Sequence, residues 1–343
     1  MPRVARRWLA VGVNLGAAGL AVLAFALWRS ASMPTQESVT GGGVEHNFAG
    51  PHPELGYAPL PERRVTARRT EGDRVIYDVS YTIDRHGLRA TPARDPAAGP
   101  PEACIALFGD SITFGEGVSD EATFAWRLVE RSRGRVVAGN FAFSGYGPHH
   151  ALAQLQAGRV AATLDCVPTH AIYLFIPEHI ARVAGRMFWD RQGPRYRIGP
   201  DGFVRRDGSF DGPGPSAAAV PDLDEGLLGW RRWLRGASRT GGADEAALAV
   251  AVLATLRRDL GVLAPGIAFH TILWNPYEDR RTREVAAGLA GAGIPTLRLR
   301  DILPEFLVDR TPWVLSPDDW HPNAVAHDRI ATAIATRILA RAP

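Results

Sequence analysis

Five short, mostly apolar runs alternate along the chain with stretches of helical periodicity, and this alternation constrains the fold more than any other feature. Runs of this kind are typical of strands that are buried on both faces. They cover residues 105–108, 136–138, 172–176, 267–273 and 295–297. Strands separated by helices form a mostly parallel sheet with helices on both sides. The sequence therefore predicts a three-layer α/β/α domain with a flavodoxin-like parallel sheet.

The first apolar run ends in a turn that carries a candidate nucleophile. Gly109-Asp110-Ser111 directly follows Phe108, so the Ser111 hydroxyl is expected just past the carboxyl end of a strand. Open α/β sheets bind their ligands at that edge. A serine hydroxyl is a weak nucleophile, so it needs a base and a carboxylate that orients the base.

A second segment, near the end of the chain, can supply both groups. Residues 316–322 read Ser-Pro-Asp-Asp-Trp-His-Pro, and we expect them to form a loop before the last helix. In that loop Asp318, three residues before His321, would orient the imidazole and stabilise its charged form. We therefore predict Ser111 as nucleophile, His321 as general base and Asp318 as the orienting carboxylate. Asp319 is the competing candidate for the last role.

These motifs resemble those of the SGNH, or GDSL-type, serine esterase and lipase family. Residues 109–111 resemble its first block, Asn140 to Gly145 its second, and Asp318 to His321 its last. Each motif alone is weak, but their order within one α/β domain is a strong joint signal. The resemblance implies an SGNH-hydrolase-like fold and ester hydrolysis through a serine nucleophile. The sequence has no phosphate-binding glycine loop, so no cofactor is predicted.

The family's oxyanion hole is only partly matched. The resemblance assigns two donors, the backbone N–H groups of Ser111 and Gly145. The family's third donor is an asparagine in a Gly-x-Asn-Asp block after the third strand, where this chain has Glu178 and His179. His179 can donate from a ring nitrogen and is the candidate substitute, although it could instead cap the next helix or pair with Glu178. Asn140 is expected to hold the second-block loop rather than to replace the missing donor.

The N-terminal segment has the properties of a membrane anchor. No charged residue lies between Trp8 and Trp28, and a helix of that length spans about 30 Å, the thickness of a bilayer core. The arginines that precede it predict a cytoplasmic N terminus and an exported, periplasmic catalytic domain. A cleaved signal peptide that ends near residues 30–32 is the alternative. We expect residues 1–29 to be an uncleaved inner-membrane anchor.

Further segments follow the anchor. Residues 30–50 are small, polar and glycine-rich, which predicts a flexible linker. Residues 51–98 contain two strand-like runs joined by Glu71-Gly72-Asp73, which predicts a small β module packed on the catalytic domain. Residues 99–343 are expected to form the domain that resembles the SGNH hydrolases. Its insertion, at about 184–243, is expected to overhang the site.

A few residues outside the motifs are candidates for substrate contact. Trp189, Trp230 and Trp233 in the insertion could stack on a sugar or cover an acyl chain, although at least two are expected to pack the insertion against the domain. His86 and Arg89 could also reach a substrate, but surface turn positions are expected for both.

Composition restricts the partners and cofactors. The formal net charge is +3, and arginines of the N-terminal segment account for it, so nothing indicates a nucleic-acid partner. No cluster of histidines and cysteines has metal-ligand spacing, so no metal is predicted. Cys104 and Cys166 fall on or near neighbouring strands in the strand order that the resemblance implies, at the end opposite the site. Export would permit a disulfide between them, and two buried free thiols are the alternative.

Three functions remain open at this stage. The first is an exported esterase that removes an O-acyl group from a carbohydrate or a lipid. The second is an acyltransferase that passes the same acyl group to an envelope glycan. The third is a catalytically inactive binding or assembly protein that retains the fold. In each case the predicted partners are a small-molecule, glycan or lipid ester and the inner membrane.

Overall fold

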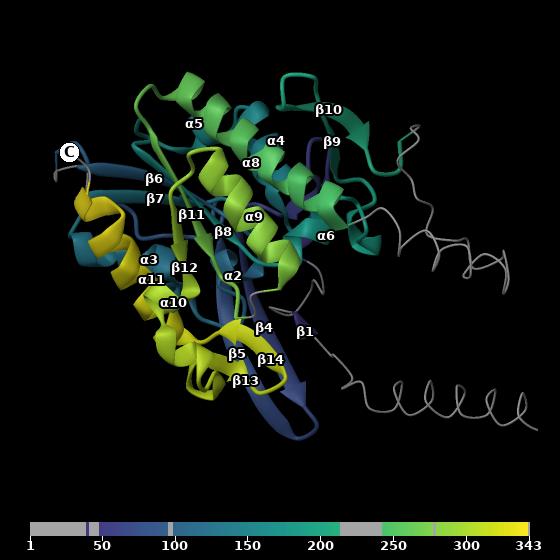
Figure 1. Ribbon diagram of the computed structural model, residues 1–343. Coiled ribbons are helices and arrows are strands. Elements are labelled where there is room, and N and C mark those ends of the chain that lie inside the picture. The colour runs from purple at the N-terminus through teal and green to yellow at the C-terminus, as the bar shows by residue number, and fades with distance from the viewer. Residues whose placement is uncertain (1–38, 41–47, 95–98, 213–241, 277–278, 342–343) are drawn as a thin grey trace, which may run out of the picture.

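The computed structural model describes residues 39–40, 48–94, 99–212, 242–276 and 279–341. At its centre lies a parallel sheet of five strands in the order β12-β11-β8-β6-β7 (Figure 1). The strands are β6 Ala103–Phe108, β7 Val136–Asn140, β8 His170–Phe175, β11 Ala268–Leu273 and β12 Thr296–Arg298. Each coincides with one of the predicted runs, so the predicted parallel sheet is confirmed.

Helices cover both faces of this sheet. Neighbouring residues of a strand point to opposite faces, so the buried side chains of one strand belong to two separate clusters. On β6, Ala106 and Phe108 belong to one buried cluster, whereas Ile105 and Leu107 belong to another. The first cluster includes residues of α4 Pro148–Gln156, α5 Arg159–Thr163, α6 His179–Val183, α8 Gly242–Leu263 and α9 Arg280–Gly291. The second includes residues of α3 Phe124–Ser132, α10 Leu299–Ile302 and α11 Ala324–Arg337. The domain therefore has the three layers that the sequence predicts.

Shorter elements complete the catalytic domain. They are α2 Ser111–Phe114, the antiparallel pair β13 Val314–Ser316 and β14 Asp319–Pro322, and the 3-10 helices η2 Asp120–Ala122, η3 Phe188–Asp190, η5 Pro304–Leu307, η6 Thr311–Trp313 and η7 Leu339–Arg341. Because α2 follows β6 directly, it lies at the carboxyl end of the sheet.

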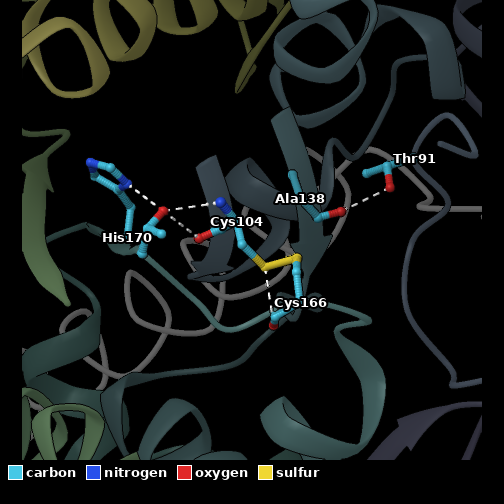
Figure 2. Close-up of a disulfide and its surroundings, with 6 residues drawn as sticks. Thr91, Cys104, Ala138, Cys166 and His170 are labelled. Atoms are coloured by element: carbon cyan, nitrogen blue, oxygen red, sulfur yellow. Dashed lines mark hydrogen bonds between the residues drawn. A yellow bond between two sulfur atoms is a disulfide. The ribbon is translucent and has the colours of Figure 1, made fainter. Parts of the chain in front are cut away.

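A disulfide joins Cys104 of β6 to Cys166, which lies shortly before β8 (Figure 2). The two Cα atoms are 6.1 Å apart. Thr169 adds to this link, because its hydroxyl accepts a hydrogen bond of 3.0 Å from the Cys104 N–H. β6 and β8 are neighbours, and the disulfide lies at their amino ends, opposite the end where Ser111 follows β6. Of the two alternatives for the cysteines, the structure has the disulfide.

The N-terminal β module is built from antiparallel pairs of strands. β2 Ala49–His52 pairs with β3 Gly56–Pro59, and β4 Arg63–Glu71 pairs with β5 Arg74–Ile83. The predicted hairpin is therefore present. β1 Val39–Thr40 adds a strand beside β4, although it lies in the stretch expected to be a linker.

A third buried cluster holds this module against the catalytic domain. It brings Leu55, Tyr81 and Ile83 of the module together with Phe114 and Phe143 of the domain. Tyr81 and Phe114 pack edge to face with ring centres 5.3 Å apart, an arrangement that aromatic pairs favour. Since Phe114 ends α2, the module lies against the element that begins with Ser111.

Arg89, which was expected at a surface turn, is buried between the module and the domain at 1% exposure. Its guanidinium donates to Asp120 at 2.6 Å and to the carbonyl oxygens of Gly115 and Val118 at 3.3 and 2.9 Å. A buried arginine needs a carboxylate and further acceptors of this kind. Arg89 therefore holds the loop that follows α2. His86 lies half-buried in its turn.

The insertion follows α6. It begins with η3 and continues as a hairpin formed by β9 Pro194–Ile198 and β10 Val204–Ser209. Trp230 and Trp233 lie outside the described residues. The stretch from Trp8 to Trp28 lies outside them too. Within the part of the chain that is described, no helix has both the length and the apolar character needed to cross a bilayer.

Candidate active site

The turn between β6 and α2 presents the Ser111 hydroxyl at the carboxyl edge of the sheet, as predicted. Gly109 has a φ of 153° and no room for a side chain, because a Cβ there would lie 2.2 Å from Thr113 Oγ1. Asp110 is the N-cap of α2, and its Oδ1 accepts a hydrogen bond of 3.1 Å from the Ile112 N–H. The glycine and the capping aspartate together fix the position of Ser111.

A chain of hydrogen bonds runs from Ser111 to a histidine and an aspartate. His321 Nε2 lies 2.8 Å from Ser111 Oγ, and His321 Nδ1 lies 2.6 Å from Asp319 Oδ1. The backbone N–H of His321 also donates to Asp319 Oδ1, at 3.1 Å. The residues thus have the mutual geometry of a nucleophile, a general base and an orienting carboxylate.

The carboxylate in this chain is Asp319, and the prediction of Asp318 is wrong. Residues 319–322 form strand β14 rather than the expected loop. In a strand, residues two apart point to the same face, so Asp319 and His321 lie side by side. Asp318 precedes the strand, and its N–H donates to Ser316 Oγ at 3.3 Å. A spacing of three residues would suit a loop or a helix, but not this strand.

The N-terminal β module supplies a second partner to Asp319. Arg69 of β4 donates from Nη1 to Asp319 Oδ2 at 2.5 Å, while Glu71 accepts a hydrogen bond of 3.1 Å from the hydroxyl of Ser316. Burial alone would raise the pKa of Asp319, but hydrogen bonds from His321 and the charge of Arg69 lower it below its usual value. Asp319 is therefore ionised at neutral pH.

The imidazole of His321 is surrounded by negative charge. Burial alone would lower its pKa, but the carboxylates of Glu116, Asp319 and Asp110 raise it to about 9. Glu116 follows α2, and its N–H donates to the Ser111 carbonyl oxygen at 2.9 Å. No motif pointed to Glu116, although it stands only five residues after Ser111 in the sequence.

The structure does not place His179 as the missing oxyanion donor. Its ring is fully buried, with Nδ1 2.9 Å from Tyr173 Oη and 3.3 Å from the Ile176 nitrogen. Its Nε2 lies 3.4 Å from Asp110 Oδ2. Burial lowers the pKa of His179, so the ring is neutral. It supports Asp110 from inside the domain and has no access to a substrate, so the prediction for His179 is wrong.

Arg182, on the same helix α6, joins the two loops that form the site. Its Nη1 donates to Asp110 Oδ2 at 2.8 Å and to the Tyr146 carbonyl oxygen at 2.8 Å. Burial alone would raise the pKa of Asp110, but His179 and Arg182 lower it, so Asp110 is a carboxylate. No sequence motif pointed to Arg182, because its partners lie far away along the chain.

The second-block loop is held next to Ser111 by the residues that the sequence predicts. Asn140 is buried, donates from Nδ2 to the Thr113 carbonyl oxygen at 2.8 Å, and accepts from the Ala142 N–H at 3.3 Å. It holds the loop, as expected. Neither the Ser111 N–H nor the Gly145 N–H donates to an acceptor within the described residues, so both can serve a ligand.

Gly145 is closely enclosed by two aromatic side chains. It has a φ of +81°, and a Cβ there would lie 2.6 Å from Tyr57 Oη and 2.7 Å from Trp189 Nε1. Trp189 itself is 44% exposed. Of the three tryptophans considered in the insertion, the structure therefore places Trp189 at the edge of the site.

A buried group of His149, His150 and Asp190 has the composition of a metal site. His149 Nε2 lies 2.8 Å from Asp190 Oδ2, and His150 Nε2 lies 3.3 Å from Asp190 Oδ1. However, His150 Nδ1 accepts a hydrogen bond of 3.1 Å from the Gly147 N–H, so the ring proton is on Nε2 and faces Asp190. That tautomer has no lone pair to offer a metal there. The group fits a clamp between α4 and η3 better than a metal centre.

No protein-family model and no curated protein matches the sequence. Solved structures that are partly similar include an alpha/beta hydrolase enzyme from the metagenome of Lake Arreo, Spain. Its identity to this chain is 17%, with 70% of this chain and 97% of that chain covered and a TM-score of 0.39. An acetyl-xylooligosaccharide esterase from Geobacillus, solved as a mutant, shows 14% identity, coverages of 69% and 94% and a TM-score of 0.39. A psychrotrophic esterase from Pseudoalteromonas shows 14% identity, coverages of 68% and 97% and a TM-score of 0.38. Similarity at this level carries no argument about the reaction.

Proposed function

We propose that the protein is a serine esterase of the SGNH type that cleaves an O-acyl ester through a covalent acyl-enzyme. The observation that carries this proposal is the continuous chain of hydrogen bonds from Ser111 through His321 to Asp319, at 2.8 and 2.6 Å. An inactive binding or assembly protein has no need for three such residues in this mutual geometry.

The geometry supports a two-step reaction. Ser111 Oγ attacks the ester carbonyl carbon while His321 Nε2 takes its proton, and Asp319 stabilises the imidazolium that forms. The negative oxygen of the tetrahedral intermediate lies toward the N–H groups of Ser111 and Gly145. Collapse breaks the ester C–O bond, and His321 returns the proton to the leaving alcohol. Water then attacks the acyl-serine by the same route and releases the acid.

We further propose that this domain works outside the cytoplasm, behind an anchor formed by residues 1–29. The charge-free stretch from Trp8 to Trp28 supports the anchor. The disulfide between Cys104 and Cys166 supports an oxidising compartment, because disulfides persist mainly in exported proteins. A carbohydrate or lipid ester of the cell envelope is the substrate class that fits this location.

The test is active-site labelling followed by a substrate panel. The full-length protein in detergent is treated with a fluorophosphonate probe, beside Ser111→Ala, and then assayed with esters of increasing acyl length. We expect labelling and ester turnover in the wild type alone. Absence of both in a folded wild-type protein would contradict the proposal. Turnover that requires an added glycan hydroxyl would instead assign the acyl-enzyme to acyl transfer.

A further inference from the structure

Tyr57 lies outside the hydrolase motifs, on β3 of the N-terminal β module, and still reaches the loop that carries Gly145. Its hydroxyl donates a hydrogen bond of 2.9 Å to the carbonyl oxygen of Ser144. We propose that Tyr57 is a positioning residue that aims the Gly145 N–H at the oxyanion. This role rests on the proposed esterase function. It means that the N-terminal β module contributes a residue to the active site.

One peptide bond links the carbonyl group of Ser144 to the N–H of Gly145. The described residues contain no cis peptide bond, so the Ser144 C=O and the Gly145 N–H point in opposite directions within one rigid plane. A donor that holds the carbonyl oxygen therefore also fixes the direction of the N–H. Glycine at position 145, with φ of +81°, gives this plane more conformational freedom than another residue would. A hydrogen bond to the Ser144 carbonyl oxygen therefore restricts the direction of the Gly145 N–H.

Tyr57 is well suited to supply that hold. The Tyr146 hydroxyl donates back to the Tyr57 carbonyl oxygen at 2.8 Å, and the two rings pack edge to face at 5.3 Å. Phe143 and His150 also pack against the Tyr57 ring, with ring centres 6.0 and 5.7 Å away. Burial raises the pKa of Tyr57 far above its usual value. The hydroxyl thus keeps its proton and remains a donor at every pH at which an esterase works.

The same loop is fastened to the nucleophile turn from other directions. Arg182 bridges Asp110 to the Tyr146 carbonyl oxygen, and the Ser144 hydroxyl donates to Glu116 at 2.7 Å. These bonds place the loop beside Ser111, but they do not hold the carbonyl group of residue 144. Among the described residues, that group's hydrogen bond comes from Tyr57.

The test compares Tyr57→Phe with Tyr196→Phe. Each substitution removes one hydrogen-bonded tyrosine hydroxyl. Tyr196, on β9 of the insertion, donates to Gln156 at 2.9 Å, and this hydrogen bond does not involve the triad. Loss of an oxyanion donor costs about 10²–10³ in rate, and a misdirected donor should cost less. We expect Tyr57→Phe to lower kcat about 10- to 100-fold with little change in KM or in the pH midpoint. Tyr196→Phe should leave kcat unchanged.

Two further measurements separate this role from simple packing. A boronic acid that forms a tetrahedral adduct on Ser111 should bind Tyr57→Phe more weakly, by the same factor as the loss in kcat. A fluorinated tyrosine at position 57 keeps the ring and strengthens the donor, so kcat should change if the hydrogen bond matters. The kcat should stay constant if the ring only packs. The fluorinated variant also tests the hydrogen bond if Tyr57→Phe does not fold.

The proposal is overturned if Tyr57→Phe folds and keeps the wild-type kcat, or if Tyr196→Phe loses as much activity. It is equally overturned if boronic acid affinity does not follow kcat. Failure of the esterase function itself would look different, because the wild-type protein would then show no ester turnover at all.

Discussion

At the scale of single residues, the charge on His321 decides when the site can work. Its pKa of about 9 means that the base is protonated at neutral pH, and a protonated imidazole cannot accept the Ser111 proton. Activity should therefore rise with pH as the imidazole loses its proton, with a midpoint clearly above 6.5, the usual pKa of histidine.

Glu116 gives a direct test of that electrostatic account. Glu116→Gln removes a negative charge that raises the pKa of His321, so the midpoint of kcat/KM against pH should move to lower pH. Glu102→Gln is the control, because Glu102 is exposed and pairs with Arg135 away from the site. A midpoint that stays in place in Glu116→Gln, or a wild-type profile already complete at pH 6.5, would contradict the account.

The assignment of Asp319 can be checked against its neighbour. Asp319→Asn should lower kcat by about 10⁴, because the imidazole loses the carboxylate that fixes its tautomer. Asp318→Asn should change kcat only slightly, since Asp318 donates to Ser316 Oγ from its backbone N–H, which the substitution keeps. Steady-state kinetics on the two purified variants separate them. A large loss in Asp318→Asn with an active Asp319→Asn would reverse the assignment.

Ser111 and His321 could be predicted from the sequence because each stands in a short motif with a chemical role. Asp319 could not, since the choice between two adjacent aspartates depends on whether the segment is a strand or a loop. His179 was misjudged for a related reason. Sequence position placed it near the site, but its direction depends on the packing of α6.

At the scale of elements, β4 of the N-terminal module acts on the site through Arg69. Arg69→Gln removes one of the two cationic partners of the buried Asp319 and leaves the imidazolium of His321, so we expect a loss of about 2 kcal/mol in the free energy of unfolding. We also expect kcat to fall about tenfold, less than in Asp319→Asn, because the hydrogen bond to His321 remains. Urea unfolding and steady-state kinetics measure both effects.

Arg68→Gln is the matched control for that experiment. Arg68 is the neighbouring residue on β4, is half-exposed and pairs with the half-exposed Asp78, so its ion pair contributes little. Equal effects of the two substitutions would show that Arg69 has no special role at Asp319.

Buried strands and core-facing helices could be predicted because their periodicity is local. Helix caps were harder. Ser119-Asp120-Glu121 has the residue types of a helix N-cap, but Asp120 accepts hydrogen bonds from Arg89 and the Thr82 N–H instead. Residues 120–122 form a 3-10 helix, and Thr123 caps α3 by accepting from the Trp126 N–H at 3.2 Å. A partner distant in sequence thus changed the local structure.

At the scale of the whole molecule, the disulfide and the active site lie at opposite ends of the sheet, so stability and activity should separate. Cys104 and Cys166 are 62 residues apart, and a loop of that size predicts a contribution of about 4 kcal/mol. The double variant Cys104→Ser, Cys166→Ser should lose about this much in urea unfolding and keep its kcat at low temperature. Loss of activity in a still-folded variant would show that the two ends are coupled.

The sequence predicts the N-terminal β module as an element, but not its part in the site. Tyr57 and Arg69 contact Ser144 and Asp319 across wide gaps in the chain, and no local pattern encodes such pairs. The module and the catalytic domain therefore form one functional unit, which residue motifs in the domain alone do not reveal.

The central claim is that Ser111 carries the acyl group during turnover. The most direct test is rapid quenching of the enzyme with an ester substrate, followed by mass spectrometry of its peptides. The account predicts an acyl mass increment on the peptide that contains Ser111, its absence in Ser111→Ala, and a loss of up to about 10⁶ in kcat for that variant. An acyl group on a different residue, or full turnover by Ser111→Ala, would contradict it.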